Sequence, residues 1–509
     1  MIKNFKILFL VSLTFIACNN NDEDVVVANS SDGLPLTAGD ANFSKFVALG
    51  DSYSAGFSDG ALFIEGQKGS FVNIMAQQFA LVGGGDFKTP FMADNIGGFK
   101  IGGTQFQGPR LYFNGVAPVP VPGTPTTEIL NPAVAAAGPY NNCGVPGAKS
   151  FHLLSSGYGS FAGLLLGTAS PYYARFASQT APNSILGYAM AQTPTFFSLW
   201  IGGNDVLGYA LSGGDGSNPI TPSAGPAGVG FDATYDVLVN TLTSAGAKGV
   251  TGNIPYVNTI PHFTFVATNP VPLVAAQIAQ LNPLFSAMNS MLASVGQAPR
   301  FKTLTASSTN PLLISDEMQA YDATALFTAA FQGAPFNYPL ANASFLGALY
   351  GKARHASNTT GSRDYIVLSQ AGLIGTNKAG YPPTNSTIGV TYPMEDSATL
   401  TASEVALIKT ATDAYNVKIK AKATEKGLAF VDLNALMSQL ANGGITANSY
   451  TVTDKFVTGG GFSLDGVHAS PRGYALFANK FIEAINKTYK SNLKGVSLYD
   501  YRILFPRTL

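Results

Sequence analysis

Short apolar runs that alternate with helical patterns limit the folds open to this chain more than any other feature. Residues 69–81 and 233–245 carry apolar side chains at helical spacing, and four apolar runs separated by such patterns read as buried strands. Strands joined through helices favour a parallel sheet covered on both faces. The predicted strands are residues 45–50, 195–202, 249–255 and 428–433.

Two further helices have clear start signals. Thr401 followed by Glu404 forms a capping box, which predicts a long helix that Gly427 ends. Ser470-Pro471 places a cap and an N1 proline before a last helix to about Tyr489.

Residues 82–140 and 256–400 interrupt this alternation. They are rich in Gly, Pro, Ala, Asn and Thr and are too long to be plain connections. We therefore predict one domain over residues 41–509 with two partly ordered insertions. Loops at the carboxyl edge of a parallel sheet surround its ligand crevice, so the insertions are expected to select the substrate.

The charge balance excludes one class of function. The 509 residues include 29 Lys+Arg and 29 Asp+Glu, a net charge of +0. A nucleic-acid binder needs a basic surface, so no nucleic-acid partner is expected. Charged residues make up only 11%, which is typical of an exported protein with long irregular loops.

The N-terminus predicts export. Lys3 and Lys6 precede an apolar stretch that ends at Ala17, so residues 1–17 are expected to be a signal peptide. Phe15 to Cys18 resembles a bacterial lipobox, with Phe15 in place of the usual leucine. The resemblance implies a lipidated Cys18 that anchors the protein to a membrane, and the alternative is an ordinary cleaved signal.

A polar segment follows the cysteine. Residues 18–40 are expected to form a flexible tether. Its acidic run, Asp22-Glu23-Asp24, resembles the surface-export signal of Bacteroidetes lipoproteins, although it is also simply a solvated linker. The predicted location is the bacterial cell envelope, at the outer membrane. Whether the protein faces the periplasm or the cell surface is left open. With Cys18 lipidated, Cys143 has no disulfide partner.

The run Phe46 to Gly50 breaks into Gly50-Asp51-Ser52. Glycine permits a sharp turn, and a serine just after it lies where main-chain N–H groups have no helical partner. Ser52 can therefore act as a nucleophile whose own N–H binds the oxyanion that forms. Gly-Asp-Ser is also ordinary turn chemistry, which is the alternative.

A serine nucleophile needs a general base. His468 follows Asp465 by three residues and precedes a helix cap, so the carboxylate can orient one ring nitrogen while the other faces the serine. An Asp-Gly turn beside an exposed histidine is the alternative. His152, His262 and His355 lack such an acid and are predicted to be structural.

Two glycine-containing segments offer oxyanion donors. Asn204 follows Gly202-Gly203 at the end of a predicted strand, where its side-chain amide can donate, unless Asp205 simply caps a helix there. Gly147 can bring a main-chain N–H close to the substrate, with Gly144 as the competing choice and a plain Pro-Gly turn as the alternative.

Taken together and in this order, these blocks resemble the SGNH hydrolases, also called the GDSL esterase and lipase family. The resemblance covers about half of the chain, and Tyr53 stands where the family name has leucine. It implies a flavodoxin-like three-layer α/β/α fold without metal or cofactor. It further implies Ser52 as nucleophile, His468 as base, Asp465 as orienting acid, and an oxyanion hole of the Ser52 N–H, the Gly147 N–H and the Asn204 side chain.

Two other motifs are set aside. Residues 56–60, GFSDG, match G-x-S-x-G, but the residues before them already form the turn after a strand. Residues 97–104, GGFKIGGT, lack the lysine of a phosphate loop, and no zinc motif or Cys/His cluster is present in the sequence.

The expected function is a membrane-tethered serine esterase or lipase that acts on small-molecule or lipid esters through an acyl-enzyme. A carbohydrate O-acetyl esterase, or an inactive surface lipoprotein that binds lipid or glycan, are the alternatives. Substrate chain length and oligomeric state stay open.

Overall fold

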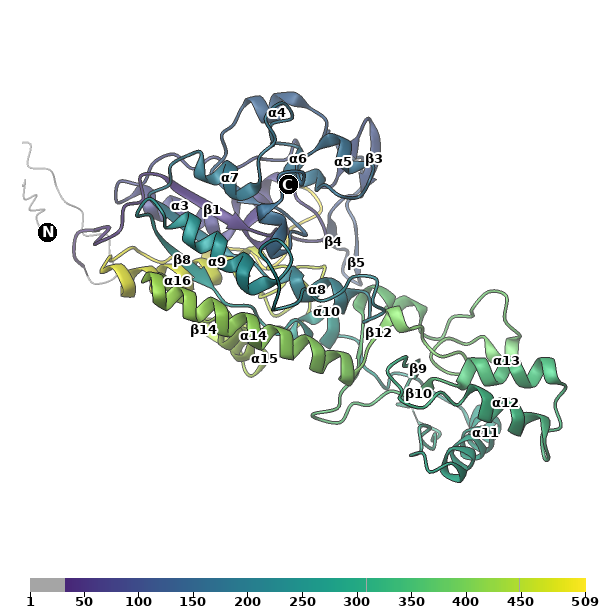
Figure 1. Ribbon diagram of the computed structural model, residues 1–509. Helices are drawn as coiled ribbons and strands as arrows, with labels where there is room; N and C mark the ends of the chain where they lie inside the picture. Colours follow the sequence, from purple (N-terminus) through teal and green to yellow (C-terminus); the bar gives the residue numbers. More distant parts are fainter. Residues whose placement is uncertain (1–32, 308, 448) are drawn as a thin grey trace, which may run out of the picture.

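A computed structural model describes residues 33–307, 309–447 and 449–509. Its centre is a five-stranded parallel sheet flanked by helices (Figure 1). The order across the sheet is β13-β8-β7-β1-β6, which is 2-1-3-4-5 when its strands are numbered along the chain. The strands are β1 (Phe46–Gly50), β6 (Asn142–Gly144), β7 (Phe196–Trp200), β8 (Lys248–Gly252) and β13 (Ala429–Val431).

Continuous apolar sequence makes the two central strands. Every residue of β1 and β7 is buried, as expected for strands covered on both faces. They pair in register from Phe46 opposite Phe196 to Gly50 opposite Trp200, so both end at one edge of the sheet. Strand order reverses between them, and such a switch point forms a crevice at the carboxyl edge.

The covering helices form two groups. α3 (Phe71–Ala80) contacts α16 (Pro471–Tyr489), which also packs on β13. α9 (Phe231–Leu242) contacts both α7 (Ile185–Met190) and α14 (Ala402–Lys426). The predicted α/β class is confirmed, and the arrangement is compatible with three layers.

The predicted helix signals are also confirmed. Thr401 and Glu404 form the reciprocal capping box of α14, and Gly427 ends that helix in the left-handed region at φ 61°. Ser470 caps α16, its hydroxyl accepting the Gly473 N–H at 3.0 Å.

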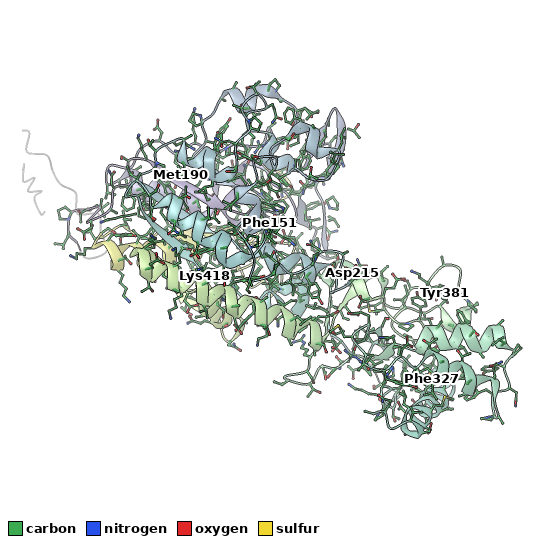
Figure 2. All side chains as sticks on the ribbon, viewed as in Figure 1. Phe151, Met190, Asp215, Phe327, Tyr381 and Lys418 are labelled. Carbon is green, nitrogen blue, oxygen red and sulfur yellow. The ribbon has the colours of Figure 1, made fainter. Side chains whose placement is uncertain are left out.

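A second hydrophobic core lies in residues 266–398, here called the small lobe. It projects from one end of the main body, as the teal-to-green segments at the right of Figure 1 and the labelled Phe327 and Tyr381 of Figure 2 show. Its elements are α11 (Ala275–Ser294), β9 (Leu313–Ser315), α12 (Thr324–Gln332), α13 (Leu340–Tyr350), β10 (Ala353–His355), β11 (Tyr365–Ile366), η3 (Leu368–Leu373), η4 (Pro383–Asn385) and η5 (Asp396–Ala398).

Short elements complete the chain. The helices are α1 (Ser52–Ala55), α2 (Ile64–Lys68), α4 (Pro132–Ala136), η1 (Ser150–Leu154), α5 (Phe161–Leu164), α6 (Pro171–Ala174), α8 (Asn204–Leu211), η2 (Val257–Thr259), α10 (Pro261–Thr264), α15 (Leu433–Ala441) and η6 (Leu498–Asp500). The remaining strands are β2 (Phe99–Ile101), β3 (Thr104–Gln107), β4 (Leu111–Phe113), β5 (Pro118–Pro120), β12 (Thr399–Leu400), β14 (Ile445–Ala447) and β15 (Tyr450–Val452).

Residues 1–32, with the predicted signal peptide and the lipidation site Cys18, lie outside the described residues. At the end of the predicted tether, Asp40 donates its N–H to the Tyr489 carbonyl at 2.6 Å. Cys143 is a buried free thiol in β6. Among the helices that the structure describes, none combines the length and apolar character needed to cross a bilayer.

Candidate active site

Three side chains lie in one hydrogen-bonded line at the carboxyl edge of the sheet. The Ser52 hydroxyl is 2.8 Å from His468 Nε2, and His468 Nδ1 is 2.8 Å from Asp465 Oδ2. With the proton on Nδ1 donated to the carboxylate, Nε2 is the acceptor for the serine hydroxyl. The structure thus brings together three residues that the sequence places near opposite ends of the chain.

The turn after β1 holds Ser52 in place. Asp51 caps α1, its Oδ1 accepting the Tyr53 N–H at 3.0 Å, so that Ser52 is the first residue of that short helix. Burial raises the pKa of Asp51 to about 6, against the Tyr53 N–H, which lowers it. Asp51 therefore has a structural role, since it caps the helix that begins with Ser52.

The Asp465 carboxylate is saturated with donors. Its Oδ1 accepts the N–H groups of Val467 and His468, each at 2.8 Å, and the Ser463 hydroxyl at 3.0 Å. Its Oδ2 accepts the Gly60 N–H at 2.9 Å, in addition to His468. Burial alone would raise the pKa of Asp465, but His468 and the main-chain donors hold it well below its usual range.

Two aromatic rings pack against His468. The Tyr53 and Phe57 rings lie 5.6 Å and 4.5 Å from the His468 ring, centroid to centroid. The Tyr53 hydroxyl donates to the Val467 carbonyl at 2.7 Å. Tyr53 therefore packs on His468 and also donates a hydrogen bond to the loop that carries it, a bond that leucine could not make.

The structure separates the two candidate glycines. Gly144 lies in β6, where its N–H donates to Asn142 Oδ1 at 3.0 Å and an added Cβ would lie 2.4 Å from the Ala55 nitrogen. Gly147 is the third residue of the turn from Val145 to Ala148, at φ 78°, which glycine adopts without strain. Its N–H has no acceptor among the described residues, so it fits the predicted oxyanion donor better.

Asn204 is tied to the same turn. Its side-chain amide donates to the Ala148 carbonyl at 3.0 Å, which leaves the second amide hydrogen for another acceptor. Asp205 does not cap α8, since the N-cap is Gly203; instead it accepts both the main-chain N–H and the hydroxyl of Ser150, at 2.8 Å and 2.7 Å. The Asp205 cap considered from the sequence is therefore wrong.

A small apolar pocket with a cavity volume of ≈ 40 Å³ lies beside Ser52. One wall is Ile254, whose N–H and carbonyl both bond the Asn416 side chain of α14, at 2.7 Å and 2.8 Å. The apolar lining of the pocket comes from Trp200, Leu207, Ile254, Pro255, Val257, Ile260, Met437 and Val467. Ser52 therefore faces a surface suited to an apolar group.

The remaining histidines and the second serine motif have local partners. His152 Nδ1 and His355 Nδ1 accept main-chain N–H groups at 3.0 Å and 2.7 Å. Ser58, the serine of GFSDG, is buried and donates to the Ala469 carbonyl at 3.1 Å. In these bonds His152, His355 and Ser58 contact main-chain groups and not Ser52, His468 or Asp465.

His262, predicted from the sequence to be structural, contacts the loop that carries Asp465 and His468, a position that the sequence did not indicate. Its N–H donates to the Gly466 carbonyl at 2.9 Å, and its Nδ1 lies 3.0 Å from the Asp465 carbonyl oxygen. It thus supports the loop between Asp465 and His468. A contact between positions so far apart in the chain has no local sequence signal.

The acidic cluster able to hold a cation among the described residues, Glu317, Asp396 and Glu404, lies outside this site. Comparison of the chain with family models, with curated proteins and with solved structures gave no match.

Proposed function

We propose that the protein is a serine ester hydrolase that works through an acyl-enzyme on Ser52. The observation that carries the proposal is the line of hydrogen bonds from Ser52 through His468 to Asp465. A hydroxyl, an imidazole and an ionised carboxylate in this order form a nucleophile, a general base and the group that orients the base.

The reaction follows from these contacts. The Ser52 oxygen attacks the ester carbonyl while His468 Nε2 takes its proton, and Asp465 stabilises the imidazolium. The N–H groups of Ser52 and Gly147 and the free hydrogen of the Asn204 amide stabilise the oxyanion. His468 then returns the proton to the leaving alcohol, and a water activated by the same imidazole hydrolyses the acyl-enzyme to a carboxylic acid.

The apolar pocket favours an ester with an aliphatic acyl group, a lipase-like activity. Leu207 of α8 lines this pocket, whereas Leu211 lies one turn later and is exposed. Leu207→Trp should lower kcat/KM for octanoyl esters by roughly 10-fold, since it fills the space, and leave acetyl esters nearly unchanged. Leu211→Trp is the matched control. Faster hydrolysis of acetylated glycans than of octanoyl esters would instead support a carbohydrate O-acetyl esterase.

We further propose that the chain is an SGNH hydrolase with a flavodoxin-like fold. The 2-1-3-4-5 strand order supports this, because it is the flavodoxin-like order, and Ser52 and Asn204 follow the two strands that flank its switch point. Anchoring at the outer membrane through Cys18 is part of the same proposal and rests on the sequence alone.

A fluorophosphonate probe tests the proposal, because it reacts covalently with an activated serine. The folded protein should be labelled on the peptide that contains Ser52, and Ser52→Ala should lose both labelling and roughly 10⁴-fold or more of esterase kcat. Ser54→Ala, a change in the same helix at a buried hydroxyl without a hydrogen-bond partner, is the matched control. If the wild type is not labelled, or if the Ser52→Ala protein is as active as the wild type, the proposed esterase activity is refuted.

A further inference from the structure

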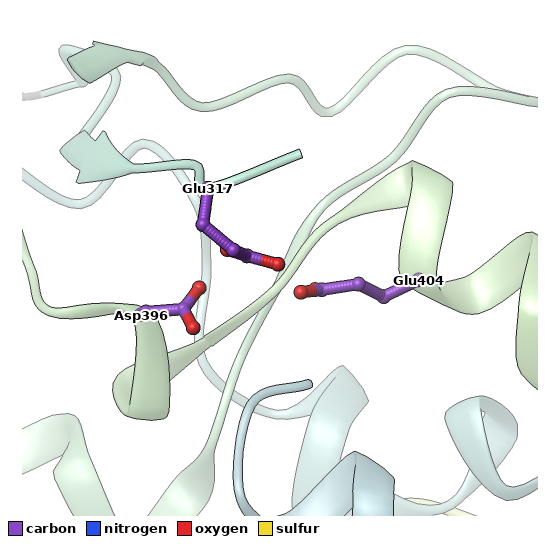
Figure 3. Close-up of side chains that lie close together, drawn as sticks. All are labelled: Glu317, Asp396 and Glu404. Atoms are coloured by element: carbon purple, nitrogen blue, oxygen red, sulfur yellow. The ribbon is translucent and has the colours of Figure 1, made fainter. Parts of the chain in front are cut away.

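Three carboxylate side chains from distant parts of the chain converge at the base of the small lobe (Figure 3). Glu317 follows β9, Asp396 begins η5, and Glu404 lies in the first turn of α14. One oxygen from each lies within 4.8 Å of those from the other two. In the figure all three side chains point toward one common centre.

No basic side chain neutralises the cluster within the described part of the chain: none of the ion pairs found there includes these carboxylates. Lys352 comes from the same lobe, but its amine donates to the main-chain carbonyls of Glu317 and Gln319, each at 2.9 Å. The charge of the three acids is thus left without a cation of the chain's own.

Glu404 gives an independent indication that this position can take a ligand. Its exposed fraction is 0%, and its Oε2 accepts the Thr401 N–H at 2.6 Å, whereas its Oε1 accepts no hydrogen bond. Asp396 Oδ1 is likewise buried and without a donor. A buried carboxylate oxygen with no partner carries a large desolvation cost, so native proteins usually pair it with a donor or a metal.

The segment after α8 closes over this oxygen. A Cβ added to Gly214 would lie 2.3 Å from Glu404 Oε1, and one added to Gly213 would lie 2.2 Å from the Asp396 carbonyl oxygen. Glycine alone allows the main chain to come this near. The main chain of Gly213 and Gly214 therefore packs directly against two of the three acidic residues.

We propose that Glu317, Asp396 and Glu404 bind one hard divalent cation, calcium in preference to magnesium. All three ligands are oxygens, which calcium and magnesium prefer, and no soft ligand belongs to the cluster. Calcium holds its oxygens at about 2.3–2.6 Å, so oxygens on opposite sides of the ion are about 5 Å apart. The spread of the three oxygens fits that shell, whereas magnesium needs a tighter octahedron.

The position suggests what the cation does. Glu317 belongs to the small lobe, and Glu404 belongs to the helix that packs on the sheet through α9 and β8. One ion bound by both joins the small lobe to the main body. The role is structural and is independent of the esterase proposed above.

Calorimetric titration of the chelator-stripped full protein with CaCl₂ at pH 8 tests the proposal. We expect one equivalent to bind with a Kd below about 1 mM, and MgCl₂ to bind at least about 10-fold more weakly. Glu317→Gln and Glu404→Gln should each weaken calcium binding by at least about 10-fold. Gln at position 404 keeps an oxygen for the Thr401 N–H, so α14 stays capped.

Glu395→Gln is the matched control, because Glu395 adjoins Asp396 but pairs with Lys378 outside the cluster. It should bind calcium as the wild type does. Thermal unfolding adds a readout that misfolding cannot imitate. In EDTA the Glu317→Gln protein should melt at or above the wild-type temperature, since repulsion is relieved, and in 5 mM calcium it should melt below it. Absence of saturable binding to the wild type, or unchanged binding to both variants, would overturn the proposal, and tighter magnesium binding would overturn the preference for calcium.

Discussion

Asp465 and Glu404 are the same kind of group in opposite settings. Both are largely removed from solvent, yet the pKa of Asp465 is held well below its usual range and that of Glu404 is raised to about 9. Asp465 accepts hydrogen bonds on both oxygens from an imidazole, a hydroxyl and main-chain N–H groups. Glu404 has one donor and faces two other acids. Burial raises the pKa of both carboxyl groups, so their donors and neighbouring charges decide which one stays ionised.

Removing the charge of Asp465 should have the largest effect. Asp465→Asn keeps the shape of the side chain but can stabilise neither the imidazolium nor the correct tautomer, so kcat for a short ester should fall by roughly 10³–10⁴-fold. Steady-state kinetics on folded protein measures this. Asp322→Asn, which makes the same change at a helix start in the small lobe, should leave kcat unchanged. Equal losses in the two variants would contradict the assigned role.

The acidic cluster should make stability depend on pH in the opposite sense to Asp465. The raised pKa values mean that the native state holds protons that the unfolded state has released, so in EDTA stability falls as pH rises from about 4 to 9. Asp465, with a lowered pKa, loses its contribution only in acid below about pH 4. In EDTA the free energy of unfolding should fall by about 2 kcal/mol between pH 5 and pH 9, a figure that is discounted because Glu317 is exposed to solvent.

Urea unfolding at several pH values measures this slope. Asp51 and Asp59 also have raised pKa values, so the informative quantity is the difference between wild type and Glu317→Gln, whose slope should be flatter. Saturating calcium should flatten the wild-type slope as well. If the free energy of unfolding has the same pH dependence in wild type and Glu317→Gln, the contrast drawn between the acidic cluster and Asp465 is wrong. Asp215, Asp316 and Tyr209 are further ionisable groups near Asp396 or Glu404, and both proteins retain them.

Removing a single donor from Asp465 should have the smallest effect. The Ser463 hydroxyl donates to Asp465 and accepts the Asp59 N–H at 3.0 Å, so Ser463→Ala should lower the free energy of unfolding by about 1–2 kcal/mol. The remaining donors keep Asp465 ionised, and kcat should fall by less than about 10-fold. Ser198→Ala, at a buried hydroxyl without a partner, should be nearly neutral. A loss of kcat as large as that of Asp465→Asn would show that the donors do not act independently.

Much of the sheet could be predicted because long apolar runs form its central strands. β6 could not, since Asn142, Cys143 and Gly144 show neither an apolar run nor strand alternation. The structure of the small lobe could not be predicted from the sequence either. Its α11 contains Pro283, a residue that normally argues against a helix interior, and its core joins short segments spread over residues 266–398.

The candidate site divides in the same way. Asp465 and His468 could be paired from their spacing, because three residues suffice to bring their side chains together. Ser52 lies 416 positions away from His468 and was joined to it by resemblance. Gly144 and Gly147 could be told apart only by their main-chain surroundings. Glu317, Asp396 and Glu404 are spread over three segments, and no spacing connects them.

α14 joins these two regions through a single rigid element. Glu404 lies at its beginning, and Asn416, about 18 Å farther along the axis, holds both main-chain groups of Ile254 in the pocket wall. One helix therefore contributes both to the acidic cluster and to the support of the pocket wall beside Ser52.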